Sequence, residues 1–325
     1  MSVRIVVLLL TLVLAALTQS PGVSAQKGSK MYRLGWVSLQ PAPTQLPPHY
    51  AVLKPQLAER GYVEGKNVTF EPRWADGDYK RLPELLAELE RIGVDVIFAA
   101  GTKNARISQD LVKRIPLVVY TCDAFDHVAR LARQGGNVTG VTCMTSELTG
   151  KRLELLKEAV PTASRVVFLS EPEDSPSGLK RAQDAAPQLG IKLITVGFKS
   201  RGEVPLALET VAKERPDALF VYPDPIAFTE RARIAEFALR QRLPTMYAFR
   251  EYVEAGGLMS YGANQVDMFR QVADLSAKIF DGKAPGDLPM LQPTKFELVI
   301  NLKTAKALGL TIPPSVLGRA DQLIE

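Results

Sequence analysis

Short apolar segments alternate along the chain with longer segments whose apolar residues recur every three or four positions. Residues 95–100 and 218–222 are almost wholly apolar, as expected of strands that helices cover on both faces. Strands separated by helices of this length predict parallel sheets with right-handed crossovers. The strands are expected at residues 31–39, 67–74, 95–100, 116–121, 165–170, 191–196, 218–222, 244–247 and 296–301. The helices are expected at 49–60, 79–92, 102–113, 125–133, 146–159, 178–189, 203–214, 226–240, 250–255, 267–280 and 304–308.

Two glycine-flanked segments divide this pattern into two arrays. Residues 135–142 read GGNVTGVT and residues 256–262 read GGLMSYG, so both combine backbone freedom with strand-forming side chains. Alone, each is typical of an ordinary turn and strand, but their position between two arrays favours a hinge. With a third crossing near Pro293, we predict an α/β protein of two doubly wound parallel-sheet lobes joined by a three-crossover hinge. Lobe 1 is expected to comprise residues 30–139 and 260–290, and lobe 2 residues 140–259 and 291–325.

The N-terminus has the pattern of a secretory signal peptide. Arg4 precedes an apolar segment at 5–17, Pro21 interrupts it, and Val23-Ser24-Ala25 resembles a small-x-small cleavage site. The apolar segment is short for a membrane span, so an uncleaved anchor is the less favoured alternative. We expect residues 1–25 to be removed, and the mature protein to be soluble in the periplasm without a lipid anchor.

Composition and charge narrow the possible partners. The 325 residues have a formal net charge of +5, and their basic residues form no stripe interleaved with aromatic residues, so nucleic acid is not expected as a partner. Cys122 and Cys143 each follow a strand-like segment; a disulfide and two buried thiols are both consistent with this pattern. With only two histidines besides, no metal site is expected.

The candidate ligand-binding residues follow the strands, because ligands of open parallel sheets bind beyond the carboxyl ends of strands. Gly101 and Thr102 begin a helix whose free N–H groups suit a carboxylate, although Thr102 also fits a plain helix cap. Asp123 and Asp224 suit an ammonium group, although both fit caps or turns as well. Arg250 suits a ligand or an internal pair with Glu251. The full set is Ser38, Gly101, Thr102, Asp123, Thr142, Glu171, Tyr222, Asp224, Arg250, Ser260 and Tyr261.

Aromatic residues also gather near the strand ends. They indicate a ligand with a flat or apolar part, although aromatic residues at these places also pack lobes together. They are Tyr120, Phe125, Tyr222, Tyr247, Phe249 and Tyr261.

Motifs of catalysis and of cofactor binding are missing from the sequence. It contains no dinucleotide-binding G-x-G-x-x-G after a strand, no phosphate-binding GK[ST] loop and no G-x-S-x-G elbow. His49 and His127 both lie away from predicted strand ends. We therefore expect neither an enzyme nor a bound cofactor.

Six segments, in order along the whole mature chain, resemble the substrate-binding proteins of ABC uptake transporters, in the branch similar to the bacterial tryptophan-type binding component. They are 62–68 (YVEGKNV), 73–77 (RWADG), 135–142 (GGNVTGVT), 151–156 (KRLELL), 256–262 (GGLMSYG) and 296–305 (FELVINLKTA). The resemblance implies a type I periplasmic-binding-protein fold with three crossovers and no catalysis. Many relatives have Asp-Pro after the fourth strand where this chain has Cys122-Asp123-Ala124, so Asp123 alone is carried over.

The function implied is that of a receptor, expected as a monomer, that closes on a small molecule. An amino acid or an aromatic or carboxylate solute is the expected class of ligand, delivered to an ABC transporter permease in the inner membrane. An extracytoplasmic sensor that feeds a signalling partner is the alternative.

Overall fold

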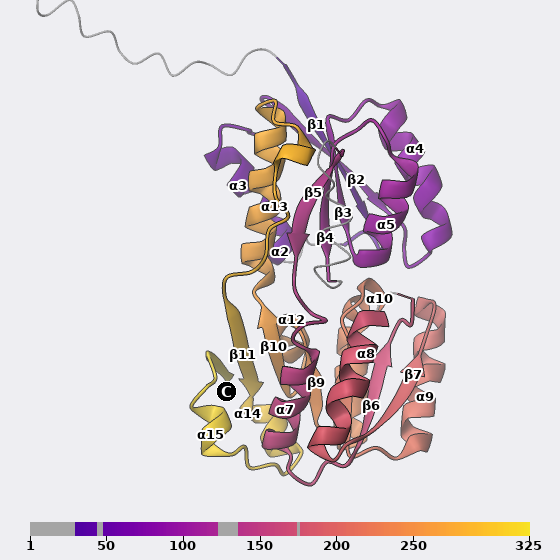
Figure 1. The fold of residues 1–325 in the computed structure, drawn as a ribbon, viewed down its shortest axis with the longest axis vertical. Helices are drawn as coiled ribbons and strands as arrows, with labels where there is room; N and C mark the ends of the chain where they lie inside the picture. The colour runs from indigo at the N-terminus through magenta and orange to yellow at the C-terminus, as the bar shows by residue number, and fades with distance from the viewer. Residues whose placement is uncertain (1–29, 44–47, 123–135, 174–175) are drawn as a thin grey trace, which may run out of the picture. The chain divides into compact units, whose positions relative to one another are not determined.

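The computed structural model describes residues 30–43, 48–122, 136–173 and 176–325 (Figure 1). The predicted signal peptide at 1–25 and the predicted helix at 125–133 lie outside the described residues. The segment Tyr32–Glu325 forms one compact unit built on two sheets. Among the described helices, none has the length and apolar character needed to cross a membrane.

The first sheet has the strand order β2-β1-β3-β4-β5, and all its neighbouring strands are parallel. Its strands are β1 (Tyr32–Ser38), β2 (Val68–Trp74), β3 (Val96–Ala100), β4 (Leu117–Thr121) and β5 (Val138–Thr142). Helices cover both of its faces, which explains why β3 and β4 are wholly buried and wholly apolar up to their last residues. The helices are α4 (Leu82–Arg91) and α5 (Thr102–Leu111) on one face, with α2 (Pro48–Ala51), α3 (Leu53–Glu59) and α13 (Gln265–Phe280) on the other.

The second sheet has the strand order β12-β11-β10-β9-β8-β6-β7. Its strands are β6 (Arg165–Ser170), β7 (Lys192–Gly197), β8 (Ala218–Val221), β9 (Thr245–Tyr247), β10 (Met259–Ala263), β11 (Phe296–Asn301) and β12 (Gln322–Ile324). Its helices are α7 (Thr149–Ala159), α8 (Pro176–Ala185), α9 (Val204–Glu214), α10 (Pro225–Thr229), α11 (Arg231–Arg240), α12 (Arg250–Glu254), α14 (Leu302–Ala307) and α15 (Pro314–Leu317).

One strand pair of the second sheet differs from the parallel arrangement. β11 pairs with β10 in antiparallel register, with Met259 opposite Ile300 and Ala263 opposite Phe296. The reason is the path of the chain: after β10 it forms α13 against the first sheet and then returns to the second (Figure 1). A crossover helix packed on the second sheet would make the pair parallel. Here the intervening helix packs on the first sheet instead, and the pair is antiparallel.

The two sheets share a common plan. The order β2-β1-β3-β4-β5 of the first is repeated as β7-β6-β8-β9-β10 in the second. In each, an aspartate before the third strand accepts a backbone N–H at the start of the neighbouring strand: Asp95 from Arg33 at 2.8 Å, and Asp217 from Ser164 and Arg165 at 2.8 Å. This plan places the carboxyl ends of equivalent strands at one edge of each sheet.

The connections between the sheets converge beside β5. Residue Leu291, in the segment after α13, donates its N–H to Gly140 at 2.8 Å and accepts the N–H of Thr142 at 2.9 Å. Gly140 is required here because a Cβ would lie 2.1 Å from the carbonyl oxygen of Val119 in β4. At the end of β5, Cys143 forms a disulfide with Cys122, with Cα atoms 5.0 Å apart, so the bonded alternative is the one realised.

Helix boundaries differ from the prediction at one place that matters for the site. The helix expected at 226–240 is broken at Glu230, where φ is −89° and ψ is 10°. The carboxylate of Glu230 accepts hydrogen bonds from Arg201 at 2.5 Å and Arg233 at 2.7 Å. The break leaves α10 as a single short helix at the end of β8.

Candidate functional site

A pocket lies where the carboxyl ends of strands from the two sheets approach each other. It contains about 490 Å³ of space, part of which is open to solvent. Five of its lining residues are aromatic, and most of the others are small or polar. The lining residues are Ser38, Gln40, Tyr50, Ala100, Gly101, Thr102, Tyr120, Cys122, Pro223, Asp224, Pro225, Phe228, Phe249, Gln265 and Phe269.

The first sheet supplies one wall through strand ends that lie in register. Ser38 of β1 pairs with Ala100 of β3, and Ala100 pairs with Tyr120 of β4. Gly101 follows with φ at +108°, a conformation that side chains disfavour, and α5 begins at the next residue. The N-terminal N–H groups of a ten-residue helix therefore lie at the pocket, where they favour an anion.

Thr102 lines the pocket but does not cap its helix. Gly101 is the N-cap residue, and among the described residues no side chain caps α5. The Thr102 hydroxyl instead accepts the N–H of Cys122 at 3.1 Å and lies 3.2 Å from the hydroxyl of Thr121. It therefore ties the start of α5 to the end of β4, close to the disulfide.

Asp224 caps a helix, as one of the two sequence alternatives expected, and it also lines the pocket. It is the N-cap of α10, and its Oδ1 accepts the N–H groups of Ile226 and Ala227, each at 2.8 Å. Its Oδ2 accepts a longer bond of 3.4 Å from the N–H of Glu171. Asp224 is only 5% exposed and lines the pocket, so a carboxylate is held rigidly at this wall.

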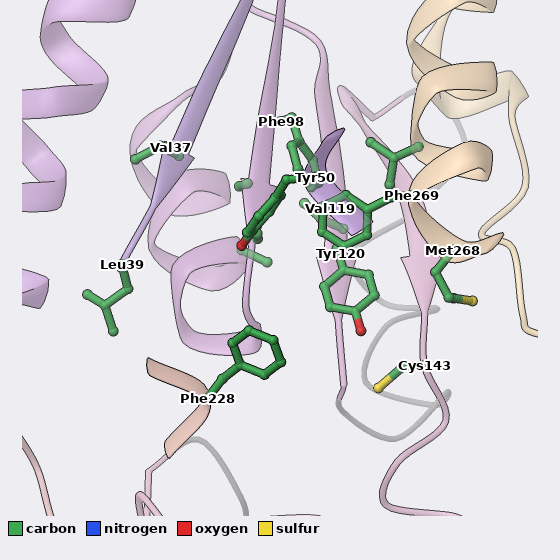
Figure 2. Packing of buried hydrophobic residues seen from close by; sticks show 14 of the residues in the cluster. Val37, Leu39, Tyr50, Phe98, Val119, Tyr120, Cys143, Phe228, Met268 and Phe269 are labelled. Atoms are coloured by element: carbon green, nitrogen blue, oxygen red, sulfur yellow. The ribbon is translucent and has the colours of Figure 1, made fainter. Parts of the chain in front are cut away.

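Aromatic rings form the remaining walls. Phe228 projects from its helix toward Tyr50 and Tyr120 (Figure 2). The ring centroids of Tyr50 and Phe269 lie 4.8 Å apart, and those of Tyr120 and Phe269 5.2 Å apart. Burial raises the pKa of the Tyr50 and Tyr120 hydroxyls, so both stay protonated at neutral pH and keep a proton to donate.

A buried polar cluster adjoins this aromatic wall, and one of its members, Gln265, lines the pocket. Gln265, at the start of α13, lies within 3.5 Å of the Tyr120 hydroxyl and donates to Glu251 at 3.1 Å. Glu251 also lies 3.6 Å from Nδ1 of buried His49. Burial raises the pKa of Glu251, but His49 and Gln265 outweigh it and the net pKa is lowered. A negative charge therefore stays behind the pocket at neutral pH.

The structure thus brings Ser38, Gly101, Thr102 and Asp224 together at the pocket, and places other candidates elsewhere. Thr142 and Tyr222 are buried beside it: Thr142 accepts the N–H of Met144, and the Tyr222 hydroxyl donates to the carbonyl of Cys122 at 3.4 Å. Glu171 is also buried, 3.8 Å from the ammonium of Lys103. None of these three is a lining residue among those described. Asp123 lies outside the described residues.

The remaining candidates, on α12 and β10, are not among the described lining residues of the pocket. Arg250 forms ion pairs with Glu254 at 3.1 Å and Glu297 at 3.3 Å, which corresponds to the internal-pair alternative with different partners. Ser260 is buried in β10, and the Tyr261 carbonyl accepts a hydrogen bond from Arg152.

Sequence reasoning missed lining residues that lie on helices instead of strand ends. Tyr50, Phe228 and Gln265 all lie in short helices or first helical turns, and each of these helices is the next described element after a strand. The sequence offers one signal for such residues, which is their position. The first helical turn after a strand lies as close to the pocket as the end of the strand does. Phe269 lies one turn after Gln265 on the same helix, so it reaches the pocket from the second turn.

Comparison with known proteins agrees with this architecture. The sequence matches the model of the family described as ABC transporter substrate binding protein over residues 48–324. It is similar to the tyrosine-binding protein of Clostridioides difficile, with 24% identity over 259 residues that cover 78% of this chain and 74% of the relative.

Solved structures confirm the fold. A conserved domain protein from Vibrio cholerae is 26% identical, with a TM-score of 0.82, and covers 90% of this chain and 100% of its own. The ABC domain from Streptococcus pneumoniae in complex with L-Trp is 24% identical, with a TM-score of 0.82 and coverage of 91% and 100%. The 5-methylthioribose transporter solute binding protein from Thermotoga lettingae is 15% identical, with a TM-score of 0.56 and coverage of 88% and 95%. The fold is that of type I periplasmic binding proteins, and the chain belongs to the family of ABC transporter substrate-binding proteins.

Proposed function

We propose that this protein is a periplasmic receptor that binds an aromatic amino acid and delivers it to the permease of an ABC uptake transporter. The observation that carries the proposal is the pocket itself, where five aromatic residues surround a helix N-terminus and a rigid carboxylate. An aromatic amino acid has the matching groups: a flat ring, a carboxylate and an ammonium. The relatives named for tyrosine and for bound L-Trp support the same class of ligand.

The proposed pose follows from charge and shape. The ring lies among Tyr50, Phe228 and Phe249, where stacked and edge-to-face contacts add to the free energy of burial. The carboxylate lies at the N-terminus of α5, at Gly101 and Thr102, and the ammonium lies toward Asp224. Polar groups at Ser38 and Gln40 remain for a ring hydroxyl or an indole N–H.

Binding is proposed to favour a closed arrangement of two lobes, each built around one sheet. The connections at the end of β5, after β10 and near Leu291 would bend, and the ligand free energy would shift the open–closed equilibrium. Export by the leader at residues 1–25 and a monomeric state complete the proposal.

Calorimetry with L-tryptophan, L-tyrosine and L-phenylalanine tests the function, with L-leucine and L-lysine as competitors of other chemistry. We expect micromolar or tighter binding of at least one aromatic amino acid. At 100 times Kd the ligand should raise the free energy of unfolding by about 2.7 kcal/mol, which a thermal shift detects. Binding of L-leucine or L-lysine in preference to all three would overturn the aromatic assignment.

Two variants locate the site. Thr102→Ala and Asp224→Ala are expected to weaken the tightest ligand at least fivefold. Thr210→Ala, on α9 and not a lining residue of the pocket, should leave affinity unchanged. Because Asp224 also caps α10, Asp224→Asn, which keeps a capping oxygen, separates loss of charge from loss of the cap. Full affinity in Thr102→Ala and Asp224→Asn would place the ligand elsewhere.

A further inference from the structure

Arg152 is an arginine with a fully buried side chain in α7, outside the ligand pocket. Burial lowers its pKa to about 10, so it remains charged at neutral pH. Among the described residues no carboxylate forms an ion pair with it, although Glu147 lies near enough to favour the charge. A buried charge of this kind is costly unless its hydrogen bonds are well made, so its partners matter.

The guanidinium of Arg152 bonds to the first connection between the sheets and to β10, the strand that runs into the second connection. Its Nε donates to the carbonyl of Tyr261 in β10, the strand that leads into α13, at 2.6 Å. Its Nη1 donates to the carbonyl of Thr145, in the segment that leads from β5 to α7, at 2.9 Å, and Nη2 lies 3.5 Å from the Thr145 hydroxyl. One rigid, planar group therefore holds both segments at once.

Gly262, which follows Tyr261 in β10, is closely packed against neighbouring atoms. A Cβ at Gly262 would lie 3.4 Å from Nη2 of Arg152 and 2.2 Å from the carbonyl oxygen of Ala248. The guanidinium therefore lies against the backbone of β10, and the Ala248 carbonyl leaves no space for a side chain at residue 262.

A short series of contacts joins the same group to the pocket. The Thr145 hydroxyl lies 3.0 Å from Sγ of Cys143, and Cys143 is bonded to Cys122, which lines the pocket. Ser146 also donates its hydroxyl to the carbonyl of Cys122 at 3.4 Å. The end of β4 at the pocket and the segment that Arg152 holds are thus directly connected.

We propose that Arg152 is a positioning residue that couples the first and second connections, so that both bend together when the pocket closes on its ligand. The coupling to ligand binding rests on the proposed function; the coupling of the two connections to each other does not. A point charge or an apolar side chain of similar length cannot bond both carbonyls from one planar group.

Amide hydrogen exchange of the unliganded protein tests the coupling directly. Arg152→Met should raise exchange tenfold or more at both residues 143–146 and residues 260–262, while β1, β3 and β6 keep their wild-type exchange. Arg152→Lys, which retains the charge, should show a smaller rise at both places. Lys151→Met is the matched control, because Lys151 is the exposed neighbour on α7 and pairs only with Glu154 in the described structure.

Calorimetry with L-tryptophan and L-tyrosine supplies the second readout, with about tenfold weaker binding expected for Arg152→Met and wild-type affinity for Lys151→Met. Exchange that rises uniformly across all strands, rises at one connection alone or does not rise would overturn the coupling. If Arg152→Met does not fold, Arg152→Lys decides by the same criterion. If the wild-type protein binds neither amino acid, the proposed ligand fails while the exchange comparison still judges Arg152.

Discussion

Gly101 is the residue at which backbone conformation and the pocket meet. Its φ of +108° suits glycine, and a Cβ there would lie 2.9 Å from Cγ of Pro225, at the start of α10. Gly101→Ala should therefore lower the free energy of unfolding by about 1–3 kcal/mol and weaken ligand binding, because the clash separates the two walls of the pocket. Urea unfolding and calorimetry measure the two effects.

Gly93 provides the control for Gly101. It also has a positive φ, +68°, but a Cβ there would meet no atom within 4 Å. Gly93→Ala should reduce stability and leave affinity unchanged. Equal affinity for wild type and Gly101→Ala would show that the approach of Gly101 to Pro225 is not needed for binding.

Asp217 is expected to make the stability of the protein depend on pH. The Ser164 N–H lowers the pKa of this carboxyl, burial opposes the effect, and Arg165 N–H and the Ser164 hydroxyl add to it. Because the folded pKa lies below the unfolded value of about 3.9, the stabilisation is full above that value and is lost as the pH falls through the folded pKa. Asp217→Asn should therefore destabilise the protein at pH 7 and much less at pH 3. An equal loss at both pH values, measured by urea unfolding, would contradict this.

Individual residues show what the sequence can and cannot reveal about the site. Ser38, Gly101, Thr102 and Asp224 were predictable because strand ends follow from the apolar pattern and ligands bind there. The ion pair of Arg250 with Glu297 was not predictable. The two residues are 47 positions apart, and Glu297 is brought near by the pairing of β11 with β10. Distances of this kind are set by the tertiary fold, which a local pattern does not encode.

At the level of elements, the disulfide at the ends of β4 and β5 is expected to be a structural staple. The half-cystines are separated by 21 residues, and a loop of that size constrains the unfolded chain by about 3 kcal/mol. Cys122→Ser with Cys143→Ser should therefore lower the free energy of unfolding by about that amount. Urea unfolding under non-reducing conditions measures it, and thiol titration of the unfolded wild type should find no free thiol. A double variant as stable as the wild type would show that the disulfide restricts the conformational freedom of the unfolded chain very little.

The bounds of strands and helices were predicted well where apolar residues form a clear pattern. They were predicted poorly where a contact between distant residues sets the bounds or the direction of an element. β3, β4, β6 and β8 fall within one residue of the ranges expected from their apolar segments. The break at Glu230 and the antiparallel β11 were missed, because the apolar pattern marks neither of them and the second depends on the chain forming α13 against the other sheet. Short terminal elements such as α15 and β12 have too few residues to show a period.

At the scale of the whole molecule, charged contacts join parts of the chain that belong to different sheets. Lys103 of α5 lies 2.5 Å from Glu173, which follows β6, and Arg106 donates to the Glu173 carbonyl at 3.0 Å. A second such contact joins Arg201, just before α9, to Asp76, just after β2, at 3.8 Å. In the proposed open–closed equilibrium these contacts would favour the closed arrangement. Solvent and salt weaken them because Glu173 is largely exposed.

Lys103→Met should therefore shift the protein toward an open arrangement and weaken aromatic amino acid binding by about two- to fivefold, as expected for an exposed ion pair. Added salt should weaken wild-type binding by a similar factor and affect the variant less, because the pair is already absent. Calorimetry at low and high ionic strength measures both, and scattering of the unliganded variant should give a larger radius of gyration than the wild type. Lys180→Met is the control, since Lys180 pairs with Asp184 within α8 and forms no ion pair with the first sheet in the part of the chain that the structure describes. Wild-type affinity, salt dependence and radius in Lys103→Met would show that closure depends on apolar contacts at the pocket and not on these charges.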